Sequence, residues 1–274
     1  MTRLQNVTMD GQSPAGAARL GGTNGRRGRA RLARRATAIA GCAAVATLIG
    51  GCVSFSASVA APSLPGSERS AKPGINEPYR DAEVKQFVDR FETESREVFA
   101  QRAQIVQDLR LKRGSAVADV GAGTGAFTFL LAEAVGPAGR VFAVDITPGF
   151  IERIRDLCAE RKASNVTPVL CREDSVDLPA GSIDAAFLCD VYHHFEYPRS
   201  SLASLHSALR PGGSLFVIDF HRIPGESSAW ILDHVRAGEK DFTREIEAAG
   251  FERLNWRPAT ANLKENYFIQ FRRK

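Results

Sequence analysis

The chain lacks the cysteine spacing of a disulfide framework or of a zinc site. Its 274 residues include five cysteines, and no two of them form a CxxC pair: Cys42, Cys52, Cys158, Cys171 and Cys189. Three of the five lie beyond residue 52, and an odd set cannot pair completely. We therefore expect a domain held together by a hydrophobic core, for which 44 % hydrophobic residues is ample.

A basic surface is also missing from most of the chain. The formal net charge is +5, but the residues before Cys52 contain eight arginines, no lysine and one aspartate. The remainder carries 28 basic and 30 acidic side chains, so its charge is about −2. This balance removes the main electrostatic argument for a nucleic-acid partner.

No apolar run near the N-terminus has the length of an ordinary membrane span. After RRGRARLARR (Arg26–Arg35) comes ATAIAGCAAVATLIGGC, whose apolar part of about 15 residues suits the hydrophobic region of a signal peptide. It ends in Ile49-Gly50-Gly51-Cys52, which resembles the lipobox of bacterial lipoproteins, where the cysteine is lipidated. The stretch ending at Cys42 has the same pattern, but only about three apolar residues precede it.

This N-terminal region predicts a location and two segments. We expect residues 1–52 to be a signal peptide or membrane anchor, and the protein to be exported or membrane-associated with Cys52 lipidated. If the leader is wrongly assigned to the protein, the location would be cytoplasmic. Residues 53–78 are rich in Ser, Ala, Pro and Gly without periodicity, which predicts a flexible linker before a domain over residues 79–274.

Strands and helices alternate along residues 79–274, and no internal repeat interrupts them. Apolar residues between 81 and 109 recur at helical spacing and predict one long or two shorter amphipathic helices. The next segments predict strands at 117–120, 140–146, 166–171, 183–190 and 214–220, and helices at 127–135, 150–161, 200–209 and 242–249. Continuous apolar strands separated by helices indicate an α/β fold with a parallel sheet covered on both faces. Two last strands, near 251–256 and 265–273, are joined too closely for a parallel crossover, so they pair antiparallel or lie apart.

The first predicted strand runs into a glycine loop, VADVGAGTGAF (Val117–Phe127). Gly121, Gly123 and Gly125 allow a tight turn and let the backbone approach a ligand. A dinucleotide fingerprint has the spacing GxGxxG, whereas here the third glycine comes one residue earlier, which counts against a nicotinamide cofactor. Asp145 ends the second strand about 20 residues later, where a carboxylate can accept both hydroxyls of a ribose.

Together with VFAVDI, REDSVDLPAGSIDAAFLCD, HHF and LRPGGSLFVIDF, this loop resembles the class I S-adenosylmethionine-dependent methyltransferases, specifically their UbiE-like or type 11 branch. The resemblance extends from about Tyr79 to the C-terminus. It implies a doubly wound, mostly parallel seven-stranded sheet, the Rossmann-like methyltransferase fold, with an antiparallel C-terminal strand and N-terminal covering helices. It also implies S-adenosylmethionine as cofactor and methyl transfer to a small-molecule or lipid-like acceptor.

The resemblance further implies which residues contact the cofactor. The DxGxGxG loop would lie against its methionine part, Asp145 would hold the ribose, and Asp174, or alternatively Glu173, would meet the adenine amino group. The full set is Asp119, Gly121, Ala122, Gly123, Gly125, Asp145, Ile146, Asp174, Ser175 and Cys189. Other roles stay open: helix packing for the glycines, capping of the following helix for Asp145, and a solvated loop position for Asp174.

Candidate catalytic residues follow the fourth predicted strand. Methyl transfer from a sulfonium needs donor and acceptor held in line, and a base only if the acceptor loses a proton. His193 or His194 is the candidate base and Asp190 the residue that orients one of them, although packing or capping suits one histidine equally well. Residues on the rim or in the N-terminal helices have weaker claims, with surface pairing or core packing as alternatives: Arg96, Arg102, Asp219, His221, Trp230 and Tyr267.

Two other functions fit parts of the pattern. One is a membrane-tethered, non-catalytic module that keeps the S-adenosylmethionine fold, because the methyl donor is made in the cytoplasm whereas a lipoprotein signal exports the domain. The other, less favoured, is a nicotinamide-dependent oxidoreductase. The expected partners are the acceptor and the membrane, and the oligomeric state is left open.

Overall fold

The structure, a computed structural model, describes residues 68–80, 83–93 and 96–274. The predicted signal peptide or anchor and most of the predicted linker lie outside these residues. Within them, every helix is too short or too polar to cross a bilayer.

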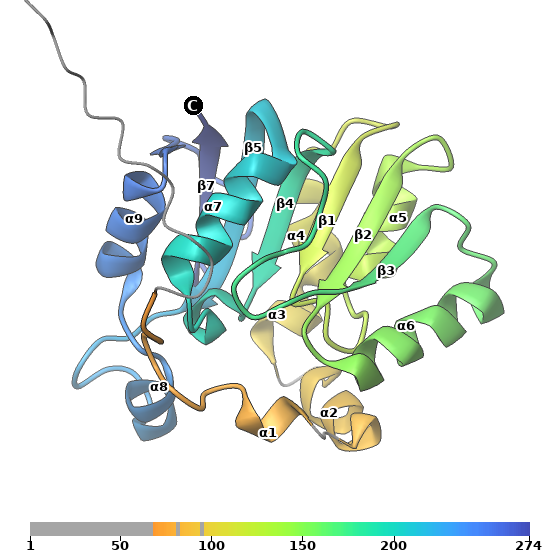
Figure 1. The fold of residues 1–274 in the computed structure, drawn as a ribbon. Helices are drawn as coiled ribbons and strands as arrows, with labels where there is room; N and C mark the ends of the chain where they lie inside the picture. Colours follow the sequence, from red (N-terminus) through yellow and green to blue (C-terminus); the bar gives the residue numbers. More distant parts are fainter. Residues whose placement is uncertain (1–67, 81–82, 94–95) are drawn as a thin grey trace, which may run out of the picture. The chain divides into compact units, whose positions relative to one another are not determined.

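The described residues form one seven-stranded sheet in the order β3-β2-β1-β4-β5-β7-β6 (Figure 1). Its strands are β1 (Ala116–Val120), β2 (Arg140–Asp145), β3 (Val166–Leu170), β4 (Ile183–Cys189), β5 (Leu209–Phe220), β6 (Phe251–Arg253) and β7 (Asn266–Arg273). The pairs from β3 to β5 are parallel, whereas β7 runs antiparallel to both β5 and β6. This confirms the predicted fold class, including the reversed C-terminal strand. The strand order turns back between β1 and β4, and such a switch point opens a crevice at the carboxyl ends of the strands.

Helices cover the two faces of the sheet because successive strand residues point to opposite sides. In β1, Val117 packs with α4 (Arg102–Asp108), α5 (Thr128–Val135) and α6 (Pro148–Arg161). Its neighbour Ala118 packs on the other side with α7 (Pro198–Ala208) and α9 (Glu239–Ala248). The sheet therefore lies between two apolar layers.

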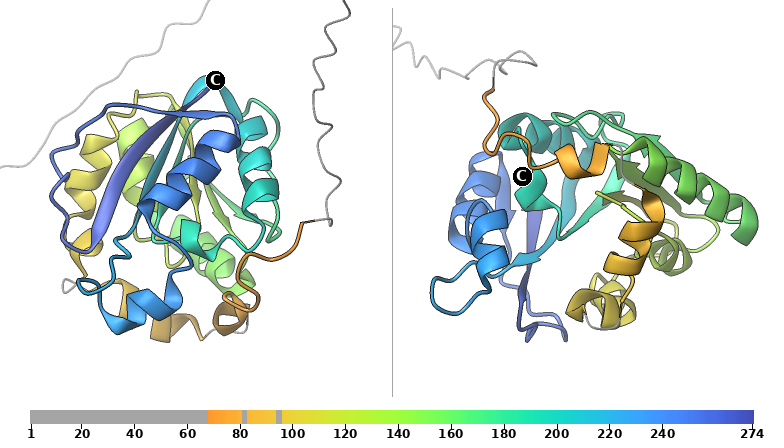
Figure 2. Two further views of the ribbon diagram at one scale, coloured as in Figure 1. Left: turned by 90° about the vertical axis from the view of Figure 1, so that its left-hand side faces the viewer. Right: turned by 90° about the horizontal axis from the view of Figure 1, so that it is seen from below.

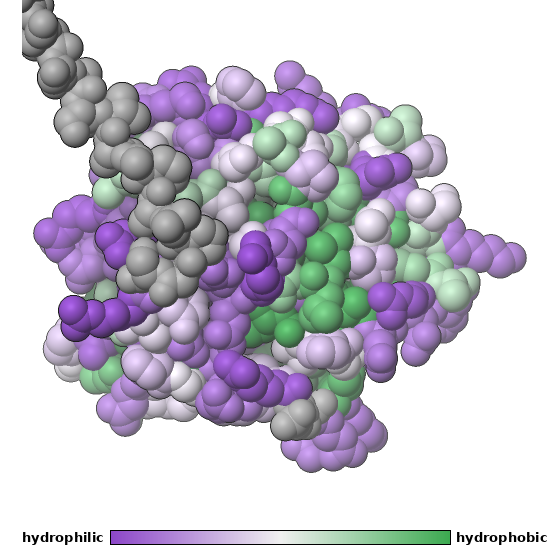
Figure 3. Space-filling model, viewed as in Figure 1, coloured by the Kyte–Doolittle hydropathy of each residue, from purple (hydrophilic) through white to green (hydrophobic). Residues whose placement is uncertain are grey.

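One part of the sheet departs from the expectation of helices on both faces. The connection between β3 and β4, residues 171–182, is fully described and contains no helix. Asp177 has φ 48° and accepts a hydrogen bond from the backbone N–H of Arg172 at 3.0 Å, which closes a turn in place of a helix. Phe142 and Val169 on this face are only partly buried, and Figure 3 shows an apolar hollow on this side of the molecule.

Short helices lie beyond the carboxyl ends of the parallel strands (Figures 1 and 2). They are α1 (Glu77–Arg80), α2 (Val84–Phe91), α3 (Glu97–Ala100) and α8 (Ala229–His234), with the 3₁₀ turn η1 (Tyr192–His194) after β4. The sequence predicted one long or two shorter helices over 81–109, whereas the structure has α2, α3 and α4, because the backbone leaves helical geometry at Glu92 and again at Gln101. The sequence did not predict α1, α8 or η1.

Residues 68–76, part of the predicted linker, lie against the domain. Ser70 donates to the Glu196 carboxylate at 2.7 Å. Lys72 Nζ donates to the backbone carbonyls of Asp233 and His234 at 2.6 and 2.7 Å. The first described residues are thus attached to the same end of the sheet as α1 and α8.

Candidate functional site

A cavity of about 510 Å³ lies at the carboxyl ends of β1, β2 and β4. This volume is within the range of small-molecule sites. The walls include ten of the residues predicted for the site: Gly121, Ala122, Gly123, Asp145, Ile146, Ser175, Cys189, Asp190, His193 and His194. A second cavity of about 520 Å³ shares five lining residues with it: Ile146, Thr147, Cys171, Arg172 and Glu173. Asp119, Gly125 and Asp174 do not line the first cavity, and Asp174 lines the second.

The three glycines of the loop have positive φ angles of 70°, 52° and 88°, but they serve different purposes. A Cβ at Gly121 would lie 2.0 Å from Val191 Cγ2, so this glycine allows the loop to pack against the segment after β4. A Cβ at Gly125 would lie 3.4 Å from Phe129 and Ile154, which places this glycine under α6. Only Gly123 has open space where its Cβ would be, with the nearest atom 3.9 Å away. Gly123 is therefore the position at which the backbone can lie against a ligand.

Asp145 joins the glycine loop to the start of α6. Its Oδ2 accepts a hydrogen bond from the backbone N–H of Gly123 at 2.8 Å, and its Oδ1 accepts one from Thr147, the residue before α6, at 2.8 Å. Burial raises the pKa of the carboxyl, while these backbone donors oppose the rise. The carboxyl group therefore fixes the loop, supports the helix start and still forms part of the cavity wall.

Asp119 is not among the residues that line the first cavity. Its Oδ2 accepts a hydrogen bond from Thr128 Oγ1 at 2.6 Å, which fastens the end of β1 to α5. Burial raises the pKa of Asp119 to about 7, and the nearby Asp145 adds to the rise. The structure thus gives Asp119 a role in shaping the loop, without a place on the cavity wall.

The two candidates for the adenine contact are separated in the structure. Glu173 lines both cavities, and its carboxylate accepts a hydrogen bond from Arg80 Nη2 at 2.7 Å. Asp174 lines only the second cavity, with Arg172 Nε 3.9 Å from its Oδ1. A ligand in the first cavity meets Glu173 before it meets Asp174.

Asp190 belongs to a charged cluster in the cavity wall. It has φ 55°, pairs with Arg96, and accepts a hydrogen bond from Asn266 Nδ2 at 2.6 Å. Burial raises its pKa to about 6, and the Arg96 guanidinium opposes that rise. Arg96 is therefore part of the cavity wall, and it pairs there with Asp190.

Asp219, and not Asp190, holds His193. The Asp219 carboxylate lies 2.7 Å from His193 Nδ1 and also accepts the His193 backbone N–H at 3.0 Å, and both side chains are buried. His194 Nδ1 lies 3.2 Å from Asn76 Oδ1. The catalytic assignment of Asp190, His193 and His194 stays a prediction.

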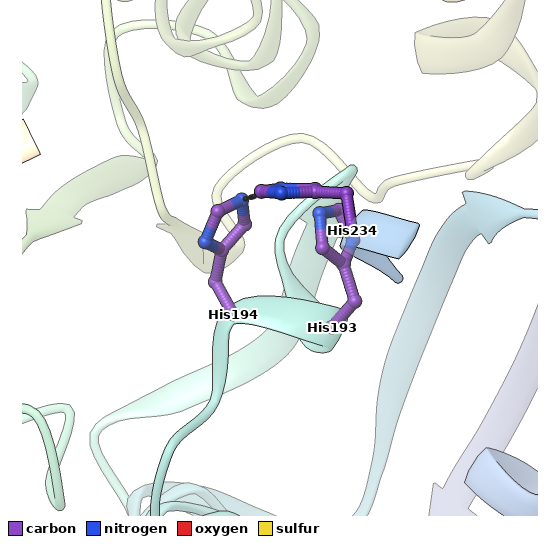
Figure 4. Close-up of side chains that lie close together, drawn as sticks. All are labelled: His193, His194 and His234. Carbon is purple, nitrogen blue, oxygen red and sulfur yellow. Dashed lines mark hydrogen bonds between the residues drawn. The ribbon is translucent and has the colours of Figure 1, made fainter. Parts of the chain in front are cut away.

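A third histidine faces the predicted pair (Figure 4). His234, from α8, places its Nε2 3.4 Å from Nε2 of His194. Burial, together with the neighbouring histidines, lowers the pKa of His194 well below its usual value. Burial and His193 lower the pKa of His234 to about 4.

Several residues of the cavity wall had no signal in the sequence. Asn76 and His234 line the cavity, and Asn266 does not line it but donates a hydrogen bond to Asp190 in its wall. The three come from separate segments, and no local spacing connects them with the glycine loop. Trp230 is 44 % exposed, lines the cavity and stacks on His234 with ring centroids 4.9 Å apart, so the alternative that placed it in the core is wrong. Tyr267, in contrast, is buried as expected and is not among the residues that line the cavity.

Comparison with known proteins gives a family for the central part of the chain. Residues 117–213 match the family described as "Methyltransferase domain". Over 125 residues the chain is 28 % identical to the ubiquinone/menaquinone biosynthesis C-methyltransferase UbiE of Burkholderia mallei and of Burkholderia thailandensis. These matches cover 45 % of this chain and 51 % of each relative, so the chain spans about half the length of the curated relatives it matches.

Solved structures show the same fold at low sequence identity. A S-adenosylmethionine-dependent methyltransferase from Aquifex aeolicus matches with a TM-score of 0.61 and 20 % identity, over 70 % of this chain and 99 % of that one. The [4+2]-cyclase SpnF matches with a TM-score of 0.53 and 18 % identity, over 71 % of this chain and 83 % of that one. Because one of these proteins is named a cyclase, the fold alone does not determine the reaction.

Proposed function

We propose, from the premise that this chain carries a class I S-adenosylmethionine-dependent methyltransferase domain, that it transfers a methyl group from S-adenosylmethionine to a small-molecule acceptor. The observation that carries the proposal is the pairing of Gly123 with Asp145. The cavity wall contains both the backbone of Gly123, which carries no side chain, and the carboxyl group of Asp145, which accepts a hydrogen bond from that backbone. This pairing occurs at the sheet edge where doubly wound folds bind ligands.

The residues present fit this cofactor. Asp145 would accept the ribose hydroxyls, the backbone at Gly123 would lie under the methionine part, and Glu173 or Asp174 would meet the adenine at the side shared with the second cavity. The sulfonium of the cofactor supplies an activated methyl group. The protein then has to hold the acceptor in line with that group and keep water out.

The acceptor would occupy the opposite wall of the cavity. That wall combines aromatic side chains with a few polar groups, the usual make-up of a small-molecule site: Tyr79, Phe91, Phe99, Phe220 and Trp230 with Asp190, His193 and His194. This composition suits a largely apolar acceptor with one or two heteroatoms. A lipid-like acceptor is one such molecule.

Calorimetric titration of the full-length chain tests the donor site. S-adenosylmethionine and S-adenosylhomocysteine should bind and NADH should not. Asp145→Ala should weaken binding by roughly 10–100-fold, the usual cost of losing a charge-assisted hydrogen bond. Asp156→Ala, an exposed aspartate on α6, is the matched control and should bind as the unaltered chain does.

Two results would contradict the donor site. Equal affinity in Asp145→Ala and Asp156→Ala would remove Asp145 from it. Absence of binding to either sulfur ligand would refute the enzyme as proposed and leave a tethered module without cofactor as the better explanation.

We also propose that residues 1–52, which lie outside the described residues, attach the protein to a membrane through lipidation of Cys52. The support is the sequence pattern Ile49-Gly50-Gly51-Cys52 after an arginine-rich segment and an apolar run. Fractionation of tagged full-length protein should move Cys52→Ser from the membrane fraction to the soluble fraction. Cys42→Ser, the matched control, should remain with the membrane. Membrane association unchanged by Cys52→Ser would contradict lipidation at that residue.

A further inference from the structure

Three histidines converge on one wall of the cavity. His193 and His194 come from η1 and His234 from α8, and one ligand atom from each lies within 4.8 Å of the other two. Figure 4 shows the rings of His193 and His194 side by side, with the ring of His234 facing them. All three line the cavity proposed for the acceptor.

One pair of nitrogens has the spacing of two ligands on one metal ion, and the third ligand atom lies within 4.8 Å of both. Two nitrogens that bind zinc at about 2.0–2.1 Å in tetrahedral geometry lie about 3.3–3.4 Å apart. The Nε2 atoms of His194 and His234 are 3.4 Å apart. We propose that His193, His194 and His234 bind a divalent first-row transition metal, with Zn²⁺ the best fit to three imidazoles.

The outer contacts of two histidines leave the correct nitrogen free. His193 Nδ1 lies 2.7 Å from a carboxylate oxygen of Asp219. Because a carboxylate only accepts hydrogen bonds, Nδ1 carries the proton, and Nε2 is left for the metal. His194 Nδ1 lies 3.2 Å from Asn76 Oδ1, an amide oxygen that also accepts, and again Nε2 is left. A carboxylate or amide that fixes a histidine in this way is the usual second layer of a histidine metal site.

Charges of both signs surround the cluster: Asp219 is negative, and Lys72 and Arg90 are positive. Asp219 is buried beside His193 and provides a negative charge in contact with a ligand. The nearby Lys72 is positive, but its Nζ is directed to the backbone carbonyls of Asp233 and His234. Lys72 therefore holds the end of α8 in the position from which His234 reaches the other two histidines.

A tetrahedral metal ion with three protein ligands keeps a fourth coordination position for another ligand. Catalytic zinc sites use this arrangement, and the fourth position holds water or substrate. If the proposed methyl transfer is correct, an oxygen, nitrogen or sulfur of the acceptor would take this position. The cation would stabilise the deprotonated heteroatom, and the proton would leave to solvent. The histidines would then act as ligands and not as bases. Metal binding itself does not depend on the proposed function.

The test uses the full-length chain freed of metal by a chelator, with no methyl donor present. Titration with Zn²⁺ and, separately, with Co²⁺ should show one bound ion per chain, and Co²⁺ should give the intense visible absorption of tetrahedral coordination. His234→Ala should weaken binding by at least about 100-fold, more than changes in second-layer contacts usually cost. His206→Ala, a histidine on α7 that contacts Phe251, is the matched control and should bind as the unaltered chain does.

Two further measurements separate this proposal from others. His194→Gln should lose the Co²⁺ spectrum as His234→Ala does, and circular dichroism should show both variants folded. His234→Ala should still bind S-adenosylmethionine, which keeps a failure of the metal site distinct from a failure of the donor site. Absence of a bound metal, or equal metal affinity in His234→Ala and His206→Ala, would overturn the proposal and leave the 3.4 Å contact as a plain hydrogen bond between imidazoles.

Discussion

The glycine loop offers two substitutions that should have clearly different effects. In Gly121→Ala the new Cβ would lie 2.0 Å from Val191 Cγ2, so Val191 or the loop must move. In Gly123→Ala the nearest atom would be 3.9 Å away, an ordinary contact. Both residues have positive φ, at 70° and 52°, so the strain of an L-residue in the left-handed region is common to the two variants.

The expected magnitudes follow from these contacts. An alanine in the left-handed region costs about 1–2 kcal/mol in free energy of unfolding, and this applies to both variants. Forcing a methyl group into a packed contact costs about 1–3 kcal/mol more, and this applies only to Gly121→Ala. We expect Gly121→Ala to lose about 2–5 kcal/mol and Gly123→Ala about 1–2 kcal/mol.

Urea denaturation of the full-length variants measures the stability difference, and calorimetric titration with S-adenosylmethionine measures the functional one. Gly123→Ala should keep most of its stability and lose affinity for the donor, because its methyl group would occupy cavity space. A second substitution, Val191→Ala, should remove much of the extra penalty of Gly121→Ala because it removes both Cγ atoms, including the one at 2.0 Å, and leaves only the Cβ at 2.9 Å. Equal stability losses in the two single variants, or a penalty at Gly121 that Val191→Ala leaves unchanged, would refute the reasoning.

Two further predictions concern buried carboxyl groups. Burial raises the folded-state pKa of Asp119 to about 7 from a usual 3.8. The contribution of this carboxyl group to the free energy of unfolding is therefore complete below about pH 4 and is lost as the pH rises towards 7. The loss is at most about 4 kcal/mol. Asp119→Asn should therefore show a weaker loss of stability between pH 5 and 8 than the unaltered chain in denaturation curves, and parallel pH profiles would contradict this. Arg96→Ala removes the cation paired with buried Asp190 and should cost about 2–4 kcal/mol, which Asp190→Asn in the same chain should largely restore. A double-mutant cycle that shows no coupling between these two residues would contradict the pairing.

The positions of the strands along the chain followed from the sequence because each strand is a short apolar run bounded by polar residues. The short connection after β6 left antiparallel pairing of β6 with β7 or no pairing, and the structure shows the antiparallel pair. The reversal of β7 against β5 was implied by the family resemblance. The uncovered part of the sheet did not follow, because alternation of strands and helices implies two covered faces and says nothing about a connection that forms a turn. The short helices α1 and α8 are below the length at which apolar periodicity is visible.

The donor side of the cavity was predictable because its residues lie in one loop and at the end of the next strand. Gly123 and Asp145 are neighbours through a single backbone hydrogen bond. The acceptor side was not, because the partners of Asp190 and His194 come from distant segments. Asp190 contacts Arg96 and Asn266, and His194 contacts Asn76, only after the chain has folded. Sequence spacing also did not indicate that Asp219, at the end of β5, would hold His193.

The way residues 68–76 are fastened has a mechanical consequence. Glu68 lines the second cavity and receives hydrogen bonds from the backbone N–H groups of Arg199 and Ser200, while Asn76 contacts His194. A pull applied to the chain before Glu68 would therefore act first on the contacts of Glu68 with the start of α7 and, further along the chain, on the contact of Asn76 with His194. If the protein is anchored through Cys52 as proposed, tension in the leader would act directly on the wall of the second cavity, which Glu68 lines.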